Sequence, residues 1–206
     1  MKIIGITGGI GSGKSFVADV AAGYFKILHI STDAIATAQM KKGGISFKGV
    51  VDEFGKMCDN LIMDDGELNR PALASLVFSD RKLLEKLNSI THPNVINEVN
   101  RIVEFEKSRG YYDAVLIESA IIIESGIADD CDAVWYVHAP LLCREERLRR
   151  TRGYSDEKIK SILDDQLDEK AFIDRADTFI ENGDDVTVDN LVCQIKRALE
   201  ALAAKR

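Results

Sequence analysis

The chain has 206 residues, of which 46% are hydrophobic and 30% are charged; a fold of this size buries about 70–75% of its unfolded surface. This composition is typical of ordinary soluble globular proteins and excludes fibrous and disordered classes. The net charge of −7 excludes the broad basic surface that nucleic-acid binding needs. No apolar run approaches the roughly 18 residues of a membrane span, so we expect no membrane partner. The four cysteines are scattered without a C-x-x-C pair, which is typical of reduced thiols in a cytoplasmic protein, and we expect this location.

The first predicted element is an apolar strand over Lys2 to Thr7, which leads directly into a glycine-rich loop. Apolar residues from Val17 to Tyr24 then repeat at helical spacing, so a helix that buries one face should follow the loop. A second strand is predicted over Phe25 to Ile30. From Ala34 to Gly110 no convincing buried strand is found, and we expect a mostly helical insertion.

Within this insertion, helical patterns are separated by turn signals. The helical patterns cover Arg70 to Phe78, Asp80 to Ile90 and Asn94 to Ser108, and the turn signals are Asp64-Asp65-Gly66 and His92-Pro93.

Strands return after the insertion and alternate again with helices. The predicted strands are Ala114 to Ile117, Ala133 to Val137 and Thr178 to Ile180. One predicted helix begins at Leu141 and is broken at Gly153, a second is capped at Ser155, and the last runs from Leu191 to Ala204. Short apolar strands that alternate with helices are typical of a parallel sheet. The sequence therefore predicts an α/β fold with helices flanking a parallel sheet.

The glycine-rich loop matches the complete phosphate-loop pattern, Gly8-x-x-x-x-Gly13-Lys14-Ser15, between a strand and a helix. Such a loop directs backbone N–H groups at phosphates, the lysine reaches the β- and γ-phosphates, and the serine hydroxyl ligates Mg²⁺. A simple turn does not explain the Lys-Ser pair, and a dinucleotide fingerprint would need glycine in place of Lys14. The predicted nucleotide-binding residues are Gly8, Gly9, Ile10, Gly11, Ser12, Gly13, Lys14, Ser15 and Phe16.

Two acidic residues follow predicted strands, at the edge of the sheet where the chemistry of such folds gathers. Glu118 ends the Ala114 strand, as an acid that orients Mg²⁺ or its waters would. Asp33 follows the second strand, and its position alone fits equally a group that faces the γ-phosphate or an N-cap of a helix starting at Ala34.

Five arginines form the densest positive region of this acidic chain: Arg144, Arg147, Arg149, Arg150 and Arg152. A solvated helix face paired with Glu145 and Glu146 is one interpretation. The position of the cluster between two strands favours another, in which guanidinium groups close over phosphates. We interpret His29 and His138 as packed strand residues and Asp184-Asp185 as a solvated turn.

With these motifs the sequence resembles the dephospho-coenzyme A kinases over nearly the whole chain. The matching residues are Ile6 to Ser15, Asp33-Ala34, Gly66 to Arg70 with Phe78, Ile90 to Pro93, Glu124 to Gly126, Arg147-Leu148 with Gln166, and Ala176-Asp177 with Ile180, Asn182 and Gly183. The family differs in usually having Asp followed by Pro-Leu-Leu where this chain has Glu118 and Ala120-Ile121-Ile122. It commonly has an arginine where this chain has Thr151.

The resemblance implies a P-loop nucleoside-kinase-like core over residues 1–33, 111–139 and 172–206, a coenzyme A-binding helical domain over 34–110, and a lid over 140–171. It implies transfer of the ATP γ-phosphoryl group to the 3′-hydroxyl of dephospho-coenzyme A, with Mg²⁺. The implied catalytic residues are Asp33, Lys14, Arg147 and Arg150, and Asn182 would lie near the adenine of ATP. The implied acceptor-binding residues are Thr7, Asp33, Arg70 and His92. The implied metal-binding residues are Ser15 and Glu118.

Two other functions remain open from the residues themselves. A nucleoside or nucleoside monophosphate kinase would share the core and the lid but would not need so long a helical insertion. A regulatory module would bind ATP at the loop without transferring phosphate. The sequence does not indicate an oligomeric state.

Overall fold

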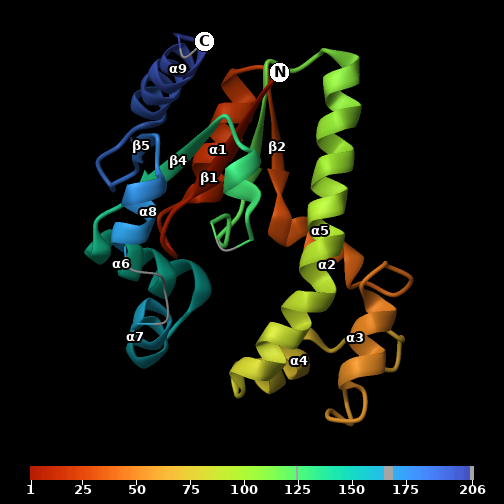
Figure 1. Cartoon of the computed structure of the whole chain (residues 1–206). Coiled ribbons are helices and arrows are strands. Elements are labelled where there is room, and N and C mark those ends of the chain that lie inside the picture. The colour runs from red at the N-terminus through yellow and green to blue at the C-terminus, as the bar shows by residue number, and fades with distance from the viewer. Residues whose placement is uncertain (124, 165–168, 205–206) are drawn as a thin grey trace. The chain divides into compact units, whose positions relative to one another are not determined.

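The computed structural model describes residues 1–123, 125–164 and 169–204, without the side chains of 164 and 169–171 (Figure 1). Glu124 and Gln166, two of the matched positions, lie outside the described residues. The chain divides into two compact units, one of Met1–Ser31 with Glu106–Arg206 and one of Thr32–Phe105. Among the described helices, none is both long and apolar enough to cross a membrane.

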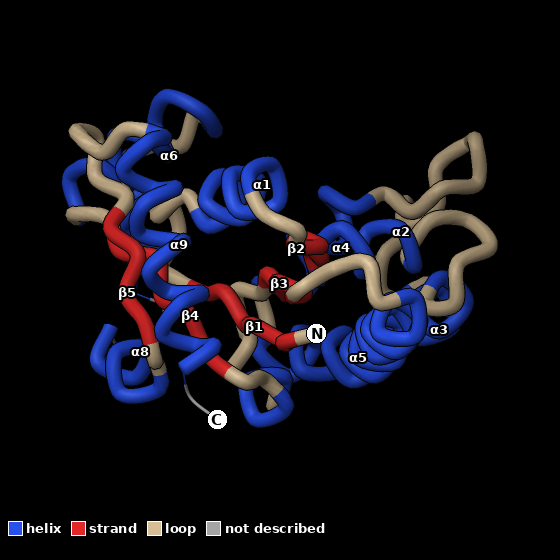
Figure 2. The backbone as a smooth tube through the Cα atoms, turned by 90° about the horizontal axis from the view of Figure 1, so that it is seen from above, coloured by secondary structure: helices blue, strands red, loops and turns tan. Residues whose placement is uncertain are grey.

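The first unit is built on a parallel sheet (Figure 2). Its described strands are β1 (Lys2–Thr7), β2 (Ile27–Ser31), β3 (Ala114–Glu118), β4 (Ala133–His138) and β5 (Thr178–Glu181). The spatial order is β2-β3-β1-β4-β5, so the strand before the glycine loop is central and is paired on both edges. The predicted parallel sheet is confirmed, although β2 begins at Ile27 rather than Phe25, which caps the preceding helix.

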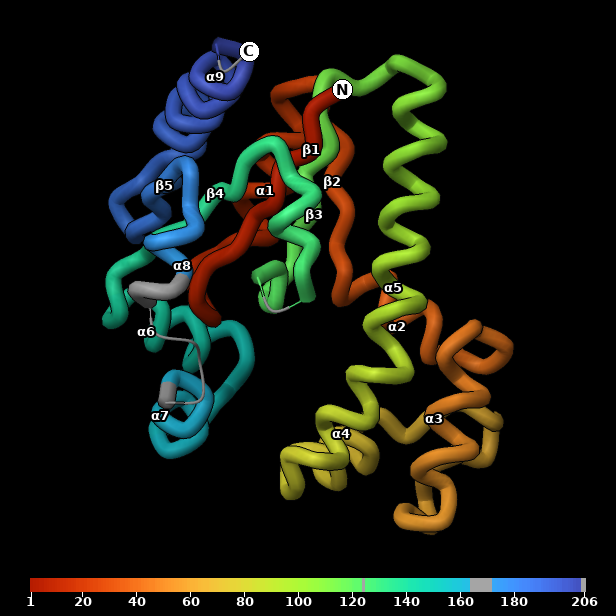
Figure 3. The backbone as a smooth tube through the Cα atoms, in the orientation of Figure 1, coloured from red at the N-terminus to blue at the C-terminus, as the bar shows by residue number. Residues whose placement is uncertain are grey.

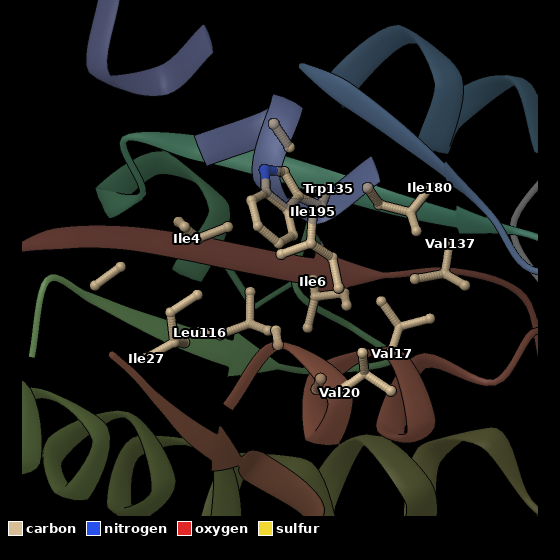
Figure 4. Packing of buried hydrophobic residues seen from close by; sticks show 14 of the residues in the cluster. Ile4, Ile6, Val17, Val20, Ile27, Leu116, Trp135, Val137, Ile180 and Ile195 are labelled. Carbon is tan, nitrogen blue, oxygen red and sulfur yellow. The ribbon is translucent and has the colours of Figure 1, made fainter. Parts of the chain in front are cut away.

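Two helices cover one face of this sheet, α1 (Lys14–Tyr24) and α9 (Val188–Ala204). Figure 4 shows the core between the sheet and these helices, where Ile6 and Trp135 of the sheet pack with Val17 of α1 and Ile195 of α9. Side chains alternate along a strand, so Tyr136 points to the opposite face. There its ring stacks on Phe172 at a centroid distance of 5.7 Å.

The connection from β4 to β5 is helical, as the sequence predicted. It contains α6 (Leu141–Arg152), α7 (Asp156–Asp164) and α8 (Glu169–Arg175), and a short 3₁₀ helix, η1 (Ile127–Asp130), precedes β4. Gly153 ends α6 with φ 62°, and Ser155 Oγ accepts a hydrogen bond from Lys158 N at 3.3 Å as the predicted cap of α7. Helix α9 begins three residues earlier than expected, because Thr187 Oγ1 accepts a hydrogen bond from Asn190 N.

The second unit is helical, as expected for the insertion (Figure 3). Its elements are α2 (Thr32–Gln39), α3 (Phe47–Phe54), α4 (Arg70–Phe78) and most of α5 (Arg81–Arg109). Phe54, Leu61 and Leu73 are buried in a separate core. The predicted turn at residues 64–66 is confirmed, with Gly66 N donating to Met63 O at 2.8 Å.

The predicted turn at His92-Pro93 is wrong, because α5 continues through Pro93 without a break. Proline inside a helix removes a hydrogen bond and costs about 3 kcal/mol. Val95, Val99 and Val103 are buried at four-residue spacing after the proline, and Asn94 Nδ2 donates to Ile90 O at 3.0 Å. Burial of this continuous face outweighs the local cost of the proline.

Trp135 offers a test of the sheet core, because it is the largest fully buried side chain there. Trp135→Ala leaves a cavity between the sheet and the helices, and we expect the free energy of unfolding to fall by about 3–5 kcal/mol. Urea denaturation followed by circular dichroism measures this change. Tyr24, which the sequence predicts on the buried face of α1, is 60% exposed at the last position of the helix. Tyr24→Ala is therefore the control and should alter stability little; equal losses in both variants would contradict the assigned core.

Candidate functional site

The glycine loop connects the carboxyl end of β1 with the N-terminus of α1 and is folded as a tight turn. Ser12 N donates to Gly9 O at 3.1 Å, and Gly13 is the N-cap of α1 with φ 85°. This left-handed conformation favours glycine, so the chain enters the helix without strain. The first N–H groups of α1 lack intrahelical partners and carry the positive end of the helix dipole, so this end of the helix is suited to an anion.

Polar side chains gather around the loop. Lys14 Nζ donates to Gly8 O at 3.2 Å, so its ammonium group lies along the loop. Thr7 Oγ1 and Ser12 Oγ are buried and have no hydrogen-bond partner among the described residues. Buried hydroxyl groups are normally hydrogen-bonded, so two such groups beside one loop are typical of a ligand site. Phe16, in the first turn of α1, is exposed.

Helix α6 packs directly on the loop through Arg144. This side chain is buried, and its Nε donates to Ile10 O at 2.9 Å. A Cβ on Gly9 would collide with the Arg144 guanidinium group, and one on Gly11 would lie 2.8 Å from the Arg144 carbonyl oxygen. Glycine at these positions therefore lets α6 approach the loop closely.

One turn further along α6, Arg147 also reaches the loop, together with Asn182 from the end of β5. Both side chains donate to Ser12 O, Arg147 NH1 at 3.4 Å and Asn182 Nδ2 at 2.7 Å. Arg147 NH2 also pairs with Asp184 Oδ1 at 2.9 Å. Hydrogen bonding from the Cys143 thiol, together with Arg147, lowers the pKa of the Asp184 carboxyl group. Asp184 is thus an ion-pair partner as well as part of an exposed turn.

The remaining arginines of the cluster are more exposed. Arg150 and Arg152 both face solvent, and Arg152 lies 6.0 Å from the Tyr154 ring centroid. Arg149 pairs with Asp156 at 2.7 Å and with Glu145 at 3.3 Å. Part of the cluster therefore contacts the loop and part of it is a paired surface, while closure of the guanidinium groups over phosphates stays a prediction.

Glu118, at the end of β3, contacts the loop helix. Its Oε1 accepts a hydrogen bond from Ser15 Oγ at 2.5 Å, and its Oε2 lies 3.0 Å from His29 Nε2. Burial by itself raises the pKa of Glu118, but the hydrogen bonds from His29 and Ser15 outweigh burial and lower it. The pKa of His29 is raised, chiefly by Glu118 against the effect of burial and with a further contribution from Asp19.

This hydroxyl and carboxylate fit a hard divalent cation. Mg²⁺ binds oxygen ligands and is usually held in proteins by one or two side chains, with substrate phosphates and water completing its shell. The structure, over the residues it describes, has no cluster of three or more His, Cys, Asp or Glu that would form an all-protein metal site. Ser15 and Glu118 are therefore suited to a cation that arrives with a nucleotide.

The second unit contains the other predicted residues. Asp33 is exposed and is the second residue of α2, so it is not the N-cap of a helix starting at Ala34. Thr37, one turn further, lines a cavity of about 410 Å³, and the cavity is also lined by Lys41 and Arg70. His92 is half-buried within α5, and burial lowers its pKa.

Three contacts of the site were not predicted from the sequence. Arg144 was predicted only as a member of a cluster, His29 as a packed strand residue and Asp184 as part of a solvated turn. A helical wheel would have placed Arg144 and Arg147 on one face of α6, but only the tertiary structure shows that this face meets the loop. The pairing of His29 depends on the register of β2 against β3, which the sequence does not give.

A parallel sheet with the order β2-β3-β1-β4-β5 and a phosphate loop after its central strand defines a P-loop kinase fold. Shikimate kinase from Acinetobacter baumannii shares this fold, with a TM-score of 0.57 over 100% of this chain and 95% of that chain at 13% identity. The family model described as dephospho-CoA kinase matches residues 2–187. The chain belongs to this family.

Two relatives named as dephospho-CoA kinases agree with this assignment, and one solved structure is similar over nearly the whole chain. The chain is 37% identical to a dephospho-CoA kinase of Moorella thermoacetica, over 90% of this chain and 86% of the relative. It is 35% identical to one of Corynebacterium diphtheriae, over 88% of each. A crystal structure of the protein TT1252 from Thermus thermophilus has a TM-score of 0.78 and 31% identity over 99% of this chain and 97% of that one.

Asn182 offers a test of the loop geometry, since its buried amide group fixes the Ser12 carbonyl from β5. Asn182→Ala removes this hydrogen bond, and we expect ATP affinity to fall about tenfold, as the loss of about 1–2 kcal/mol implies. Calorimetry with a non-hydrolysable ATP analogue measures the change. Asn100→Ala, at an exposed position of α5, is the control; unchanged affinity in Asn182→Ala would show that this contact does not shape the site.

Proposed function

We propose that this protein transfers the γ-phosphoryl group of ATP to the 3′-hydroxyl of dephospho-coenzyme A and releases coenzyme A and ADP. The observation that carries the proposal is the complete phosphate loop with cationic and acidic partners on its two sides, Arg147 and Glu118. The family match over residues 2–187 supports the choice of acceptor. This reaction is the last step of coenzyme A synthesis.

Phosphoryl transfer depends mainly on positioning and on neutralising charge. Residues 8–16 hold the phosphates of ATP, with Lys14 at the β- and γ-phosphates. Arg147 and Arg150 balance the charge on the phosphoryl group during transfer, and Asn182 lies near the adenine. Ser15 and Glu118 would hold Mg²⁺ together with ATP, and the bound cation would neutralise phosphate charge.

Asp33 acts on the acceptor. Its carboxylate accepts the proton of the 3′-hydroxyl as the hydroxyl oxygen bonds to the γ-phosphorus. The bond between this phosphorus and the bridging oxygen of ADP breaks, and ADP leaves. Asp33 lies one turn before Thr37 on α2, and Thr37 lines the cavity of the second unit. Lys41 and Arg70 of this cavity suit an anionic acceptor, with Glu67 as the one acidic residue of its described lining, and this supports a role for Asp33 at the acceptor. Thr7 and His92 complete the proposed acceptor contacts.

The proposed roles of the chain segments follow from these assignments. Residues 1–33, 111–139 and 172–206 form the nucleotide-binding core, residues 34–110 bind the coenzyme A moiety, and residues 140–171 act as a lid. The contacts of Arg144 and Arg147 with the loop support the lid assignment.

A panel of acceptors tests the function directly. ATP turnover is measured with dephospho-coenzyme A, adenosine and AMP, and calorimetry measures the binding of each acceptor. We expect phosphoryl transfer and tight binding with dephospho-coenzyme A alone. Transfer to adenosine or AMP would favour a nucleoside or nucleoside monophosphate kinase, and ATP binding without transfer would favour a regulatory module, although the family match favours neither.

Asp33→Asn tests the proposed base, because it keeps the size of the side chain and removes the carboxylate. Loss of a general base costs about 10²–10⁴ in rate, so we expect kcat to fall by this factor. The melting temperature should hardly change, since Asp33 is exposed. Steady-state kinetics and thermal unfolding measure the two effects; a destabilised variant with normal kcat would assign Asp33 a structural role.

The arginines of α6 provide a test of the lid. A group that stabilises charge in the transition state lowers kcat more than ATP affinity when it is removed. We expect Arg147→Ala and Arg150→Ala to have this effect, whereas Arg152→Ala, beside Tyr154, should be mild. Kinetics and ATP-analogue binding of the three variants measure it. A severe defect confined to Arg152→Ala would contradict the assignment, and three mild variants would indicate a solvated surface.

A further inference from the structure

His29 connects two carboxylates beside the phosphate loop. Its Nδ1 lies 3.0 Å from Asp19 Oδ1, and its Nε2 lies 3.0 Å from Glu118 Oε2. The other oxygen of Glu118 accepts the hydrogen bond of Ser15 Oγ. Asp19, His29, Glu118 and Ser15 thus form one continuous chain of side-chain hydrogen bonds that joins α1, β2 and β3.

The strand register explains how this chain forms. His29 pairs with Leu116 of β3, and Ser31 pairs with Glu118. Side chains alternate with a period of two, so Glu118 lies on the same face of the sheet as His29, two residue pairs further along. Leu116 belongs to the core that packs on α1, so both side chains are directed toward the helix that carries Ser15 and Asp19.

Burial increases along this chain toward Glu118. The exposed fraction of the side chain is 72% for Asp19, 17% for His29 and 11% for Glu118. A carboxylate in a mostly buried position needs hydrogen bonds to both oxygens. His29 occupies Oε2 of Glu118, and Oε1 therefore faces Ser15.

We propose that His29 is a positioning residue for phosphoryl transfer: it holds the Glu118 carboxylate in the orientation in which Oε1 and the Ser15 hydroxyl face the cation that arrives with ATP, and Asp19 fixes the His29 ring. The proposal rests on the proposed function, because it assigns His29 a role at the same nucleotide site. Partners that orient a metal-binding side chain in this way typically change metal affinity 10- to 100-fold when they are mutated.

The test separates the effect of the cation from that of the nucleotide. Calorimetry measures the affinity of a non-hydrolysable ATP analogue in Mg²⁺ and in EDTA, and the ratio of the two affinities gives the gain from Mg²⁺. We expect His29→Leu to reduce this gain 10- to 100-fold and to leave the affinity in EDTA unchanged. In turnover assays the Mg²⁺ concentration at half-maximal rate should rise by the same factor.

Two further variants identify the contact that matters. His29→Gln keeps an N–H donor that can reach Glu118, so it should retain part of the Mg²⁺-dependent gain that His29→Leu loses. If His29→Leu does not fold, His29→Gln takes its place in the test. Asp19→Ala frees the ring and should have a smaller effect in the same direction.

Glu118→Asp shortens the side chain that His29 holds. When His29→Leu is combined with Glu118→Asp, it should reduce the gain from Mg²⁺ much less than it does in the wild-type protein, because the two residues act through one contact.

His138 is a matched control, since it pairs with Glu181 at 2.7 Å between neighbouring strands of the same sheet, on the side of β1 opposite the strand that carries Glu118. His138→Leu should leave the gain from Mg²⁺ unchanged. The proposal is overturned if His29→Leu keeps the wild-type gain, or if its affinity falls equally in Mg²⁺ and in EDTA. If His29→Leu loses the gain from Mg²⁺ but the wild-type protein does not phosphorylate dephospho-coenzyme A, the proposed function fails, whereas the role of His29 in positioning Glu118 for the cation stands.

Discussion

The site depends on where the central strand of the sheet ends. β1 pairs with β3 on one edge and β4 on the other, and Ile4 and Ile6 are completely buried. A strand fixed on both edges cannot shift its register without exposing its apolar side chains. The glycine loop therefore leaves the sheet at a defined point, and the N-terminus of α1 follows at a defined distance from the ends of the neighbouring strands.

The two edges of β1 supply opposite charges to the loop. On the β3 edge Glu118 contacts Ser15, and on the β4 edge α6 supplies Arg144 and Arg147. A protein with a net charge of −7 thus concentrates positive charge where phosphates would bind. Because charges act most strongly when they are close and partly buried, this local arrangement matters more than the overall charge of the chain.

Features with a local cause could be predicted from the sequence. The strands, the phosphate loop and the break at Gly153 follow from apolar runs and glycine positions, and the structure agrees. The turn predicted at Pro93 was wrong because local sequence rules include the hydrogen bond that proline removes but not the burial of the valines that follow it. The contacts of His29 and Arg144 could not be predicted for a related reason, since their partners lie 89 and 134 residues away in the chain.

The close approach of α6 to the loop also constrains how the sequence can change during evolution. A side chain at Gly9 would meet the flexible end of Arg144, which a shorter residue at position 144 would remove. A side chain at Gly11 would meet the backbone of Arg144, so no single change at position 144 creates the space. Gly11 also has a φ of 78°, a conformation that other residues rarely adopt. Relatives should therefore exchange residues 9 and 144 together, whereas Gly11 should stay unchanged wherever α6 lies against the loop.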